Sequence, residues 1–237
     1  MAEEISRRLV LPQPIANVLD RDCDAERAIL ADLKPGTTMM SGDNPALPRM
    51  PKAPTLLDFF RLRFGRITYN HLLQSARRAH KAGESEKVIM ACLLHDISNG
   101  CLIRTDHAYW SAQIVAPYVD EEVAWAIQKH QALRFYPDES VGYGYPEAYV
   151  KFYGPDYVVP DYLQREYRAA RDHKWYMTSR IITVNDVYAF EANVEIDARE
   201  FEDVIGRNFK QPEEGLGFDN SPVAHMWRTM IWPTNFL

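Results

Sequence analysis

The residues best suited to chemistry in this chain are imidazole and carboxylate side chains that recur in one ordered series. Four of the seven histidines and two aspartates form it: His71, His95, Asp96, His107, His130 and Asp186. Imidazole nitrogens and carboxylate oxygens suit non-haem iron and other divalent first-row metals, and no cysteine belongs to the series. The series therefore predicts a metal site made from six side chains.

The surrounding sequence places members of this series on helix faces that point inward. His95 and Asp96 follow the apolar run VIMACLL. His130 and Asp186 each continue a row of mainly apolar side chains that would lie on one face of a helix. These stripes are Val123, Ile127, His130 and Arg134 in one segment, and Trp175, Ser179, Ile182 and Asp186 in the other. Because an ionisable group buried without a partner is costly, a shared metal would satisfy these side chains together.

Helical periodicity dominates the segment that carries the series. Ser85 is well placed to cap a helix that runs to Ile97, with Glu86 in its first turn. Asp120 is similarly placed before a second helix over residues 121–135. Strand-like alternation is almost absent, so the predicted fold class is all-α.

The later part of the chain is expected to alternate between loop and helix. Residues 137–160 are rich in Pro, Gly and Tyr, which predicts a long loop with one short helix near Glu147. A single long helix should follow from Asp161 to about Phe190. Asn220 or Ser221 before Pro222 is a good helix start, because Pro at the first helical position lacks only an orphaned N–H.

These patterns divide the chain into three parts. Residues 1–54 read as an N-terminal extension, with a short helix over residues 22–33 followed by a Pro-rich arm. Residues 55–192 form the helical domain that carries the metal site. Residues 193–237 form a C-terminal tail whose short apolar helix is expected to pack on the core.

Composition and charge exclude several classes of protein. The net charge of −6 and the pI of about 5.7 argue against a nucleic-acid binder. No apolar run approaches the roughly 18 residues that a membrane span needs, and the start MAEEISRR lacks the apolar region of a secretory signal. Three scattered cysteines, Cys23, Cys92 and Cys101, fit a reducing cytoplasm. The expected partner is a small-molecule substrate, while the oligomeric state stays open, a homodimer included.

The segment NHLLQSARRAHKAGESEKVIMACLLHDIS resembles the opening of an HD-domain metalloenzyme. That family carries a His on one helix, a His-Asp pair at the end of the next and a distant Asp on a later helix, and His71, His95–Asp96 and Asp186 match this pattern. His107 and His130 match the additional ligands of its two-metal subgroups. The series is most similar to that of the mixed-valent diiron oxygenases, the myo-inositol and organophosphonate-cleaving type, over roughly residues 66–190.

This resemblance implies an HD-type helical bundle that holds two metal ions, most readily iron. Asp96 would bridge the two ions. His71, His95 and Asp186 would hold one ion, and His107 and His130 the other. The subgroup also carries a substrate-gripping cation four residues after its last His. Arg134 occupies that position, where the family usually has Lys. The implied reaction is oxidation of a small hydroxylated or anionic substrate with O₂.

Other interpretations of the same residues remain open. An HD-domain phosphohydrolase would use the same fold with Mn or another divalent metal, although Ile97-Ser98-Asn99 departs from the residues that usually follow the His-Asp pair. A third interpretation is a non-catalytic scaffold around a relic metal site. Arg134 could instead form an ion pair with Asp138 or Glu139 at its helix end.

Several residues also have a structural interpretation. His107 could serve as a helix cap or ion-pair partner, and His130 as a buried core histidine. His80 and His173 lie in charged surroundings, and His225 is expected to be a packing residue or, less simply, part of a lid. The aromatic residues of the 135–157 segment are expected to pack a loop rather than to line a ligand site. Tyr69 is the nearest phenol before the first His, so the residues that gate the site cannot be assigned.

Overall fold

The fold of this chain is all-α. A computed structural model describes residues 48, 50–101, 106–187, 189, 191 and 194–231, and within these residues the regular elements are helices. The expected helix at 22–33 and most of the Pro-rich arm lie outside the described residues. The α-helices are α2 (Leu56–Leu62), α3 (Arg66–Lys81), α4 (Glu86–Leu94), α5 (Ile97–Cys101), α6 (His107–Val115), α7 (Glu121–Leu133), α8 (Glu147–Tyr153), α9 (Asp161–Arg171), α10 (Tyr176–Asp186), α11 (Glu202–Asn208) and α12 (Ala224–Ile231), with short 3₁₀ turns η2 (Glu139–Val141) and η3 (Ala198–Phe201).

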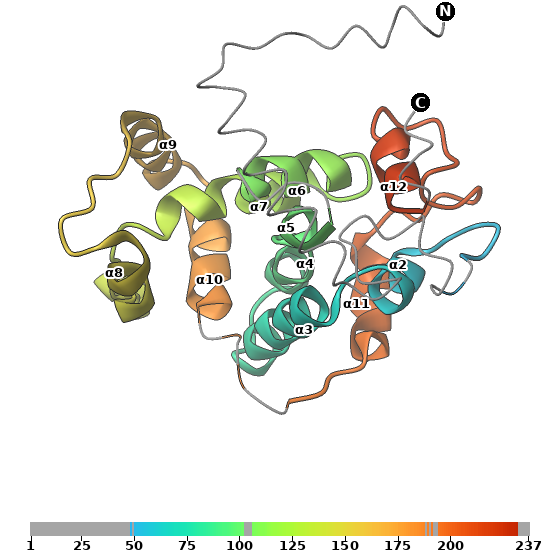
Figure 1. The fold of residues 1–237 in the computed structure, drawn as a ribbon, viewed down its shortest axis with the longest axis horizontal. Helices are drawn as coiled ribbons and strands as arrows, with labels where there is room; N and C mark the ends of the chain where they lie inside the picture. The colour runs from blue at the N-terminus through green and yellow to red at the C-terminus, as the bar shows by residue number, and fades with distance from the viewer. Residues whose placement is uncertain are drawn as a thin grey trace, which may run out of the picture.

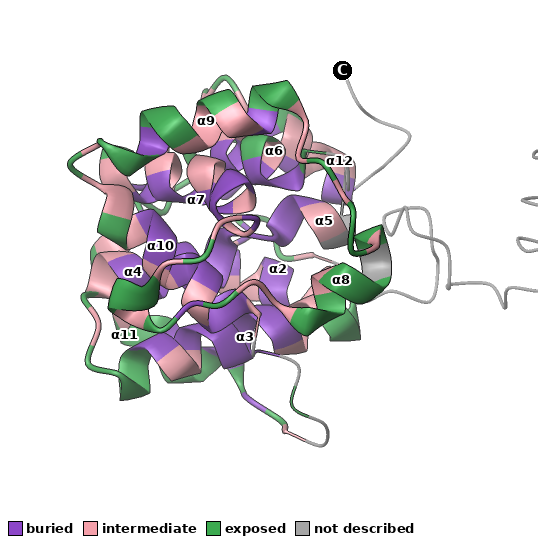
Figure 2. Ribbon diagram, turned by 90° about the vertical axis from the view of Figure 1, so that its left-hand side faces the viewer, coloured by how far each residue is buried: buried purple, intermediate pink, exposed green. Residues whose placement is uncertain are grey.

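Helix α4 occupies the centre of the bundle. It packs against α3, α7, α10 and α11, while α6 lies along α7 and α9 lies on the outer side of α7 (Figure 1). Every residue from Val88 to Leu94 is buried, so α4 is apolar all round after its charged first turn, as an enclosed stretch of helix must be (Figure 2). Helices α2, α11 and α12 gather at the opposite end of the molecule from α8 and α9.

The start of α4 is as expected from the sequence, but its end is not. Ser85 accepts a hydrogen bond from the backbone N–H of Val88 at 3.4 Å, which confirms the N-cap. The helix ends at Leu94 rather than at Ile97, and His95 and Asp96 form a turn before α5. Within this turn the His95 imidazole bonds the carbonyl of Cys92 at 2.9 Å.

Asp120 precedes α7 as expected, but it does not cap the helix with its side chain. Its backbone has the extended conformation of an N-cap residue and its carboxylate makes no capping hydrogen bond. The carboxylate instead lies 3.2 Å from the ammonium of Lys87, an ion pair that ties the start of α7 to α4.

The expected single helix from Asp161 to Phe190 is wrong, because the segment forms two helices. The chain breaks at residues 172–175, between α9 and α10. There the His173 ring stacks on Trp125 of α7 with ring centroids 4.1 Å apart. The break allows α9 to pack Leu163 on the outer face of α7 while α10 packs on its inner side. The buried stripe of Ser179, Ile182 and Asp186 is confirmed on α10.

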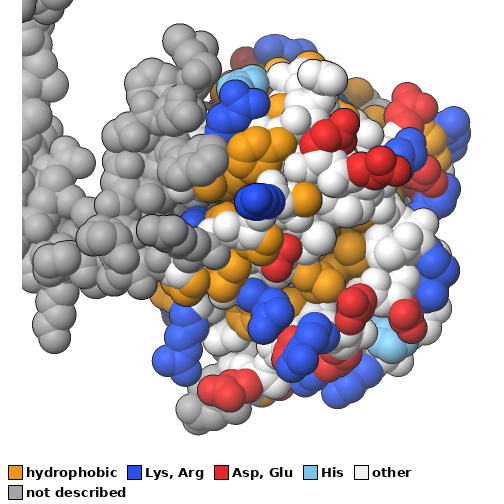
Figure 3. Space-filling model, turned by 90° about the vertical axis from the view of Figure 1, so that its right-hand side faces the viewer, with side chains coloured by type: hydrophobic (Ala, Val, Ile, Leu, Met, Phe, Trp, Pro, Cys, Tyr) orange, Lys and Arg blue, Asp and Glu red, His pale blue; other side chains and the backbone are white. Residues whose placement is uncertain are grey.

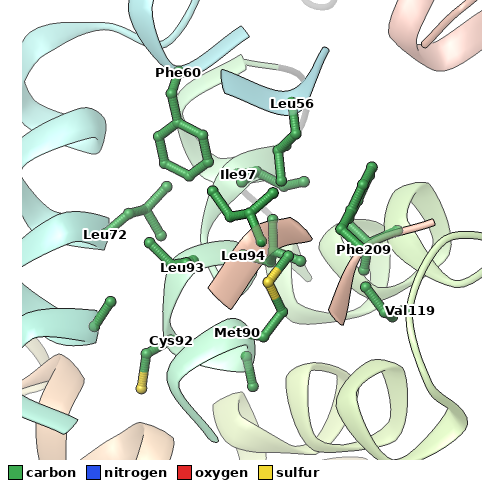
Figure 4. Packing of buried hydrophobic residues seen from close by; sticks show 14 of the residues in the cluster. Leu56, Phe60, Leu72, Met90, Cys92, Leu93, Leu94, Ile97, Val119 and Phe209 are labelled. Atoms are coloured by element: carbon green, nitrogen blue, oxygen red, sulfur yellow. The ribbon is translucent and has the colours of Figure 1, made fainter. Parts of the chain in front are cut away.

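The main core is a large apolar cluster to which the C-terminal tail contributes, and a smaller second cluster lies around Phe135 and Leu163. Figure 4 shows Leu72 of α3, Leu93 and Leu94 of α4 and Phe209 after α11 converging in the main core. The tail packs on this core as expected: Trp227 is fully buried and its indole N–H donates to the carbonyl of Ile114 at 3.0 Å. Its helix α12 begins at Ala224, two residues after Pro222, because residues 222 and 223 form a turn first.

The surface formed by α2, α11 and α12 mixes both signs of charge. Acidic and basic side chains alternate with apolar ones on this face (Figure 3). Ion pairs such as Arg207 with Glu86 link neighbouring helices on the surface. No helix in the described part of the chain is long and apolar enough to cross a membrane.

Candidate metal centre

The structure brings all six candidate ligands into one buried cluster. They form two groups that share Asp96. The first group is His71, His95, Asp96 and Asp186, and the second is Asp96, His107 and His130. Within each group one ligand-type atom from every residue lies within 4.8 Å of the others. The shared carboxylate is the residue that the sequence resemblance assigned to the bridging position.

Five structural elements supply these side chains. His71 comes from α3, His95 and Asp96 from the turn after α4, and Asp186 from the last turn of α10. His107 and His130 come from α6 and α7 respectively. Because α3, α7 and α10 all pack against α4, their inward faces meet at the end of that helix.

The first group is compact around the nitrogen of His71. Its Nε2 lies 3.1 Å from Asp186 Oδ1, 3.2 Å from His95 Nε2 and 3.7 Å from Asp96 Oδ2. His95 Nε2 lies 3.6 Å from the same oxygen of Asp186. Two imidazole nitrogens and two carboxylates thus face a common point, which is the donor set of a first-row divalent metal.

The second group is arranged around the other oxygen of Asp96. Its Oδ1 lies 3.1 Å from His107 Nε2 and 3.6 Å from His130 Nε2. The same Oδ1 lies 3.9 Å from His95 Nε2 of the first group, while Oδ2 faces His71, so Asp96 belongs to both groups. Asp106, which precedes His107, adopts a left-handed backbone with φ of 52°, a strained conformation for a residue other than glycine.

Hydrogen bonds to backbone carbonyls orient three of the four imidazoles. His71 Nδ1 donates to the carbonyl of Ala189 at 3.2 Å, His95 Nδ1 to that of Cys92 at 2.9 Å, and His130 Nδ1 to that of Ile127 at 2.6 Å. A carbonyl can only accept, so each Nδ1 carries the proton and each Nε2 presents its lone pair to the cluster. Metal-binding histidines are commonly oriented in this way.

Two buried atoms of the cluster indicate that its residues could bind a divalent cation. Asp96 Oδ1 and His130 Nε2 are buried and have no hydrogen-bond partner in the described part of the chain. Leaving buried polar atoms unsatisfied costs free energy, and a shared cation would remove that cost. All six side chains are at most 7 % exposed, so bulk water does not satisfy them either.

The electrostatics of the cluster favour ionised carboxylates and a neutral His107, whereas the pKa of His95 is raised because Asp96 and Asp186 outweigh the effect of its burial. Burial opposes ionisation of Asp96, but the imidazoles of His95, His107 and His130 hold the pKa of its carboxyl well below its usual range. The pKa of Asp186 is held well below its usual range in the same way by His71 and His95. Burial lowers the pKa of His107 to about 4, with contributions from His130 and Arg134 against the pull of Asp96.

Arg134 lies at the cluster and not at a helix-end ion pair. Its Nη2 is 3.0 Å from His107 Nε2 and 3.9 Å from Asp186 Oδ2, and its side chain is only 14 % exposed. Its guanidinium also lies over the ring of Tyr149, 5.8 Å from the centroid. Asp138, the alternative partner, instead accepts from the Tyr176 hydroxyl at 2.5 Å and lies 3.6 Å from Arg180.

Sequence reasoning missed two buried side chains that hold the end of α7. Arg180 of α10 is fully buried, and its Nη1 donates to the carbonyl of Leu133 at 3.1 Å. The Tyr143 hydroxyl donates to the carbonyl of Arg134 at 2.8 Å. A charged residue beside the buried stripe of α10 was the available signal for Arg180. Tyr143 gave no such signal, because its role depends on how the loop folds back.

The aromatic residues after α7 pack mainly against one another, as expected. Phe135 contacts Tyr149, Tyr153 and Tyr157 with ring centroids 6.1, 5.8 and 5.8 Å apart. Tyr149 additionally reaches Arg134, so this packing also forms part of the surroundings of the cluster.

The remaining histidines and Tyr69 lie outside the cluster. His80 is exposed, and His173 stacks on Trp125. The expectation that His225 is a packing residue is wrong: it is exposed on α12, because the apolar face of that helix is made by its neighbours Ala224 and Trp227. The Tyr69 hydroxyl accepts from the backbone N–H of Ala198 at 3.0 Å.

Comparison with known families agrees with this geometry. The model of the HD domain matches residues 68–150, which include five of the six clustered ligands and Arg134. Asp186 lies beyond the matched range and joins the cluster through the fold. No curated protein matches the chain. Residues 68–150 are thus similar to an HD domain, and the all-α fold and the buried His/Asp cluster, which could hold a metal ion, agree with that similarity.

Proposed function

We propose that this chain is a dinuclear metal enzyme, and specifically a diiron oxygenase that oxidises a small hydroxylated or anionic substrate with O₂. The observation that carries the proposal is the shared carboxylate: Asp96 belongs to both ligand groups and lies between them, as a bridge between two ions requires. A mononuclear site would need only the first group, and would leave His130 Nε2 buried without a partner.

The donor set supports iron as the metal. Four neutral imidazoles and two carboxylates contribute two negative charges, so two divalent ions would leave a net positive centre that attracts an anion. Nitrogen and carboxylate donors without thiolate suit non-haem iron. Iron bound in this cluster would supply the one-electron chemistry and O₂ activation that protein side chains lack.

The chain itself would position the reactants. The carbonyls of Ala189, Cys92 and Ile127 fix three imidazole rings, and burial keeps bulk water from the centre. Arg134, on the wall beside His107, offers a planar fork of N–H donors that matches a carboxylate or phosphonate.

The test is to load the protein and follow both reactions that this cluster could support. Protein purified under low oxygen should contain two irons per chain by elemental analysis, with a coupled diiron signal in Mössbauer spectra. With reductant it should consume O₂ when given hydroxylated or phosphonate-bearing substrates, and it should turn over phosphate esters poorly with Mn²⁺ or Co²⁺. The control is His173→Ala, which removes an imidazole outside the cluster.

One result would assign the hydrolase reaction instead. Rapid hydrolysis of nucleotides or aryl phosphates that is independent of iron and lost in His95→Ala would refute the oxygenase proposal. Retention of a two-metal centre in that case would still agree with the shared role of Asp96.

A further inference from the structure

The guanidinium of Arg134 contacts the second ligand group at an atom that a metal also needs. Its Nη2 lies 3.0 Å from His107 Nε2. An imidazole nitrogen has one lone pair, which can accept a hydrogen bond or bind a metal but not both. Binding of a metal through His107 Nε2 therefore requires this hydrogen bond to break.

Charge adds to this competition. A guanidinium stays protonated throughout the accessible pH range, so Arg134 brings a permanent positive charge next to the second group. A divalent ion held by His107, His130 and Asp96 would face that charge at short range inside a buried site. Repulsion there is screened far less than at the surface.

Arg134 lies farther from the ligand atoms of the first group. The short contacts of His71 Nε2 are to His95 and to the carboxylates of Asp96 and Asp186, all of which are ligand candidates themselves. The nearest approach of Arg134 to this group is the 3.9 Å distance to Asp186 Oδ2. The two groups share Asp96 but differ in how closely Arg134 approaches a ligand atom.

We propose that Arg134 is an internal competitor for the second metal, so that the two sites fill in order and an anion that binds Arg134 promotes filling of the second site. The first metal binds His71, His95, Asp96 and Asp186 tightly. The second binds weakly until an oxyanion draws the guanidinium away from His107. Because such coupling is reciprocal, the second metal strengthens binding of the anion by the same factor. The inference rests on the proposed two-metal function and adds a rule for its assembly.

This arrangement would make substrate a requirement for the complete centre. A carboxylate or phosphonate can accept two parallel bonds from a guanidinium, which replaces the single bond to an imidazole nitrogen. The reactive pair of ions would then form when an anion is present to use it, and the substrate class is restricted to molecules with a planar or tetrahedral oxyanion.

The first experiment is anaerobic titration of the metal-free protein with Co²⁺, followed by calorimetry and by the visible absorbance of the bound ion. The wild type should bind in two steps, the second at least tenfold weaker than the first. Arg134→Met should tighten the second step by at least tenfold and leave the first unchanged. Lys129→Met is the matched control, because it removes one positive charge from the same helix at a residue that pairs with Glu166.

The second experiment repeats the titration with methylphosphonate as the anion probe. In the wild type the probe should tighten the second step, and in Arg134→Met it should have less than a third of that effect. An equal effect in both proteins would mean that the probe binds the metal directly, and the proposal would be wrong. Two wild-type steps of equal affinity that the probe does not change would also overturn it, whether or not Arg134→Met folds.

These titrations separate the inference from the proposed function. Co²⁺ binding does not depend on any reaction, so a protein that proves to be a hydrolase can still show ordered, anion-coupled filling. Conversely, binding of one Co²⁺ per chain under all conditions would refute the two-metal function itself, and Arg134→Met would then not create a second site.

Discussion

Replacing Asp96 with Asn should weaken both metal sites, whereas replacing Asp186 with Asn should weaken one. The two substitutions are chemically identical, and both remove a buried carboxylate without changing the shape of the side chain. They differ only in position: Asp96 belongs to both ligand groups and Asp186 to the first alone. The pair therefore isolates the bridging role from the general cost of losing a charge.

The expected magnitude follows from the number of contacts. Loss of an outer-shell partner of a metal ligand already costs about 10–100-fold in affinity, which is roughly 1.4–2.8 kcal/mol. Loss of a ligating carboxylate should cost at least as much at each site that it serves. Asp186→Asn should then lose at least about 1.4 kcal/mol of total binding free energy, and Asp96→Asn at least about 2.8 kcal/mol, shared between two sites.

The assay is metal titration of both variants, with stoichiometry measured by elemental analysis after dialysis. Asp96→Asn should retain less than one metal per chain, and Asp186→Asn should retain its second-group affinity. Melting of the metal-free proteins provides the control for folding. Equal losses in the two variants, with one site intact in each, would refute the bridging role of Asp96.

Three further predictions concern stability and support of the site. Burial lowers the pKa of His107 to about 4, so between about pH 6.5 and 4 the unfolded chain binds more protons than the folded one. The metal-free protein should therefore lose stability as the pH falls through this range. Denaturant titrations at several pH values measure this dependence, and His107→Gln should reduce its slope. Trp227→Ala should lower the free energy of unfolding by about 3–5 kcal/mol in urea titrations, because its fully buried indole packs the tail on the core. An effect below about 1 kcal/mol would show that the tail does not unfold together with the core. Arg180→Met should weaken binding of the second metal, because Arg180 holds the end of α7. Arg180→Lys should not restore the affinity, because one ammonium cannot reach Leu133, Tyr176 and Asp138 together. Unchanged Co²⁺ affinity in Arg180→Met would contradict this positioning role.

The parts of the fold that sequence predicted well depend on local patterns. The start of α4 follows from Ser85 and the apolar residues behind it, and the short helix near Glu147 follows from turn residues on either side. The break between α9 and α10 could not be predicted in this way. It depends on a long-range contact, because the His173 ring stacks on Trp125, some 48 positions earlier in the chain.

In the candidate site, too, some orienting hydrogen bonds are local in sequence and could be predicted, whereas others are long-range and could not. His95 and His130 each bond the carbonyl of the residue three positions earlier in the chain, so the local backbone encodes the orientation of each ring. His71 instead bonds the carbonyl of Ala189, which becomes its neighbour only when the end of α10 packs against α3. Nothing near His71 in the sequence specifies that carbonyl. Spacing and residue type can therefore name a ligand, while the direction of its lone pair can be predicted from sequence only where the orienting group lies within one helical turn.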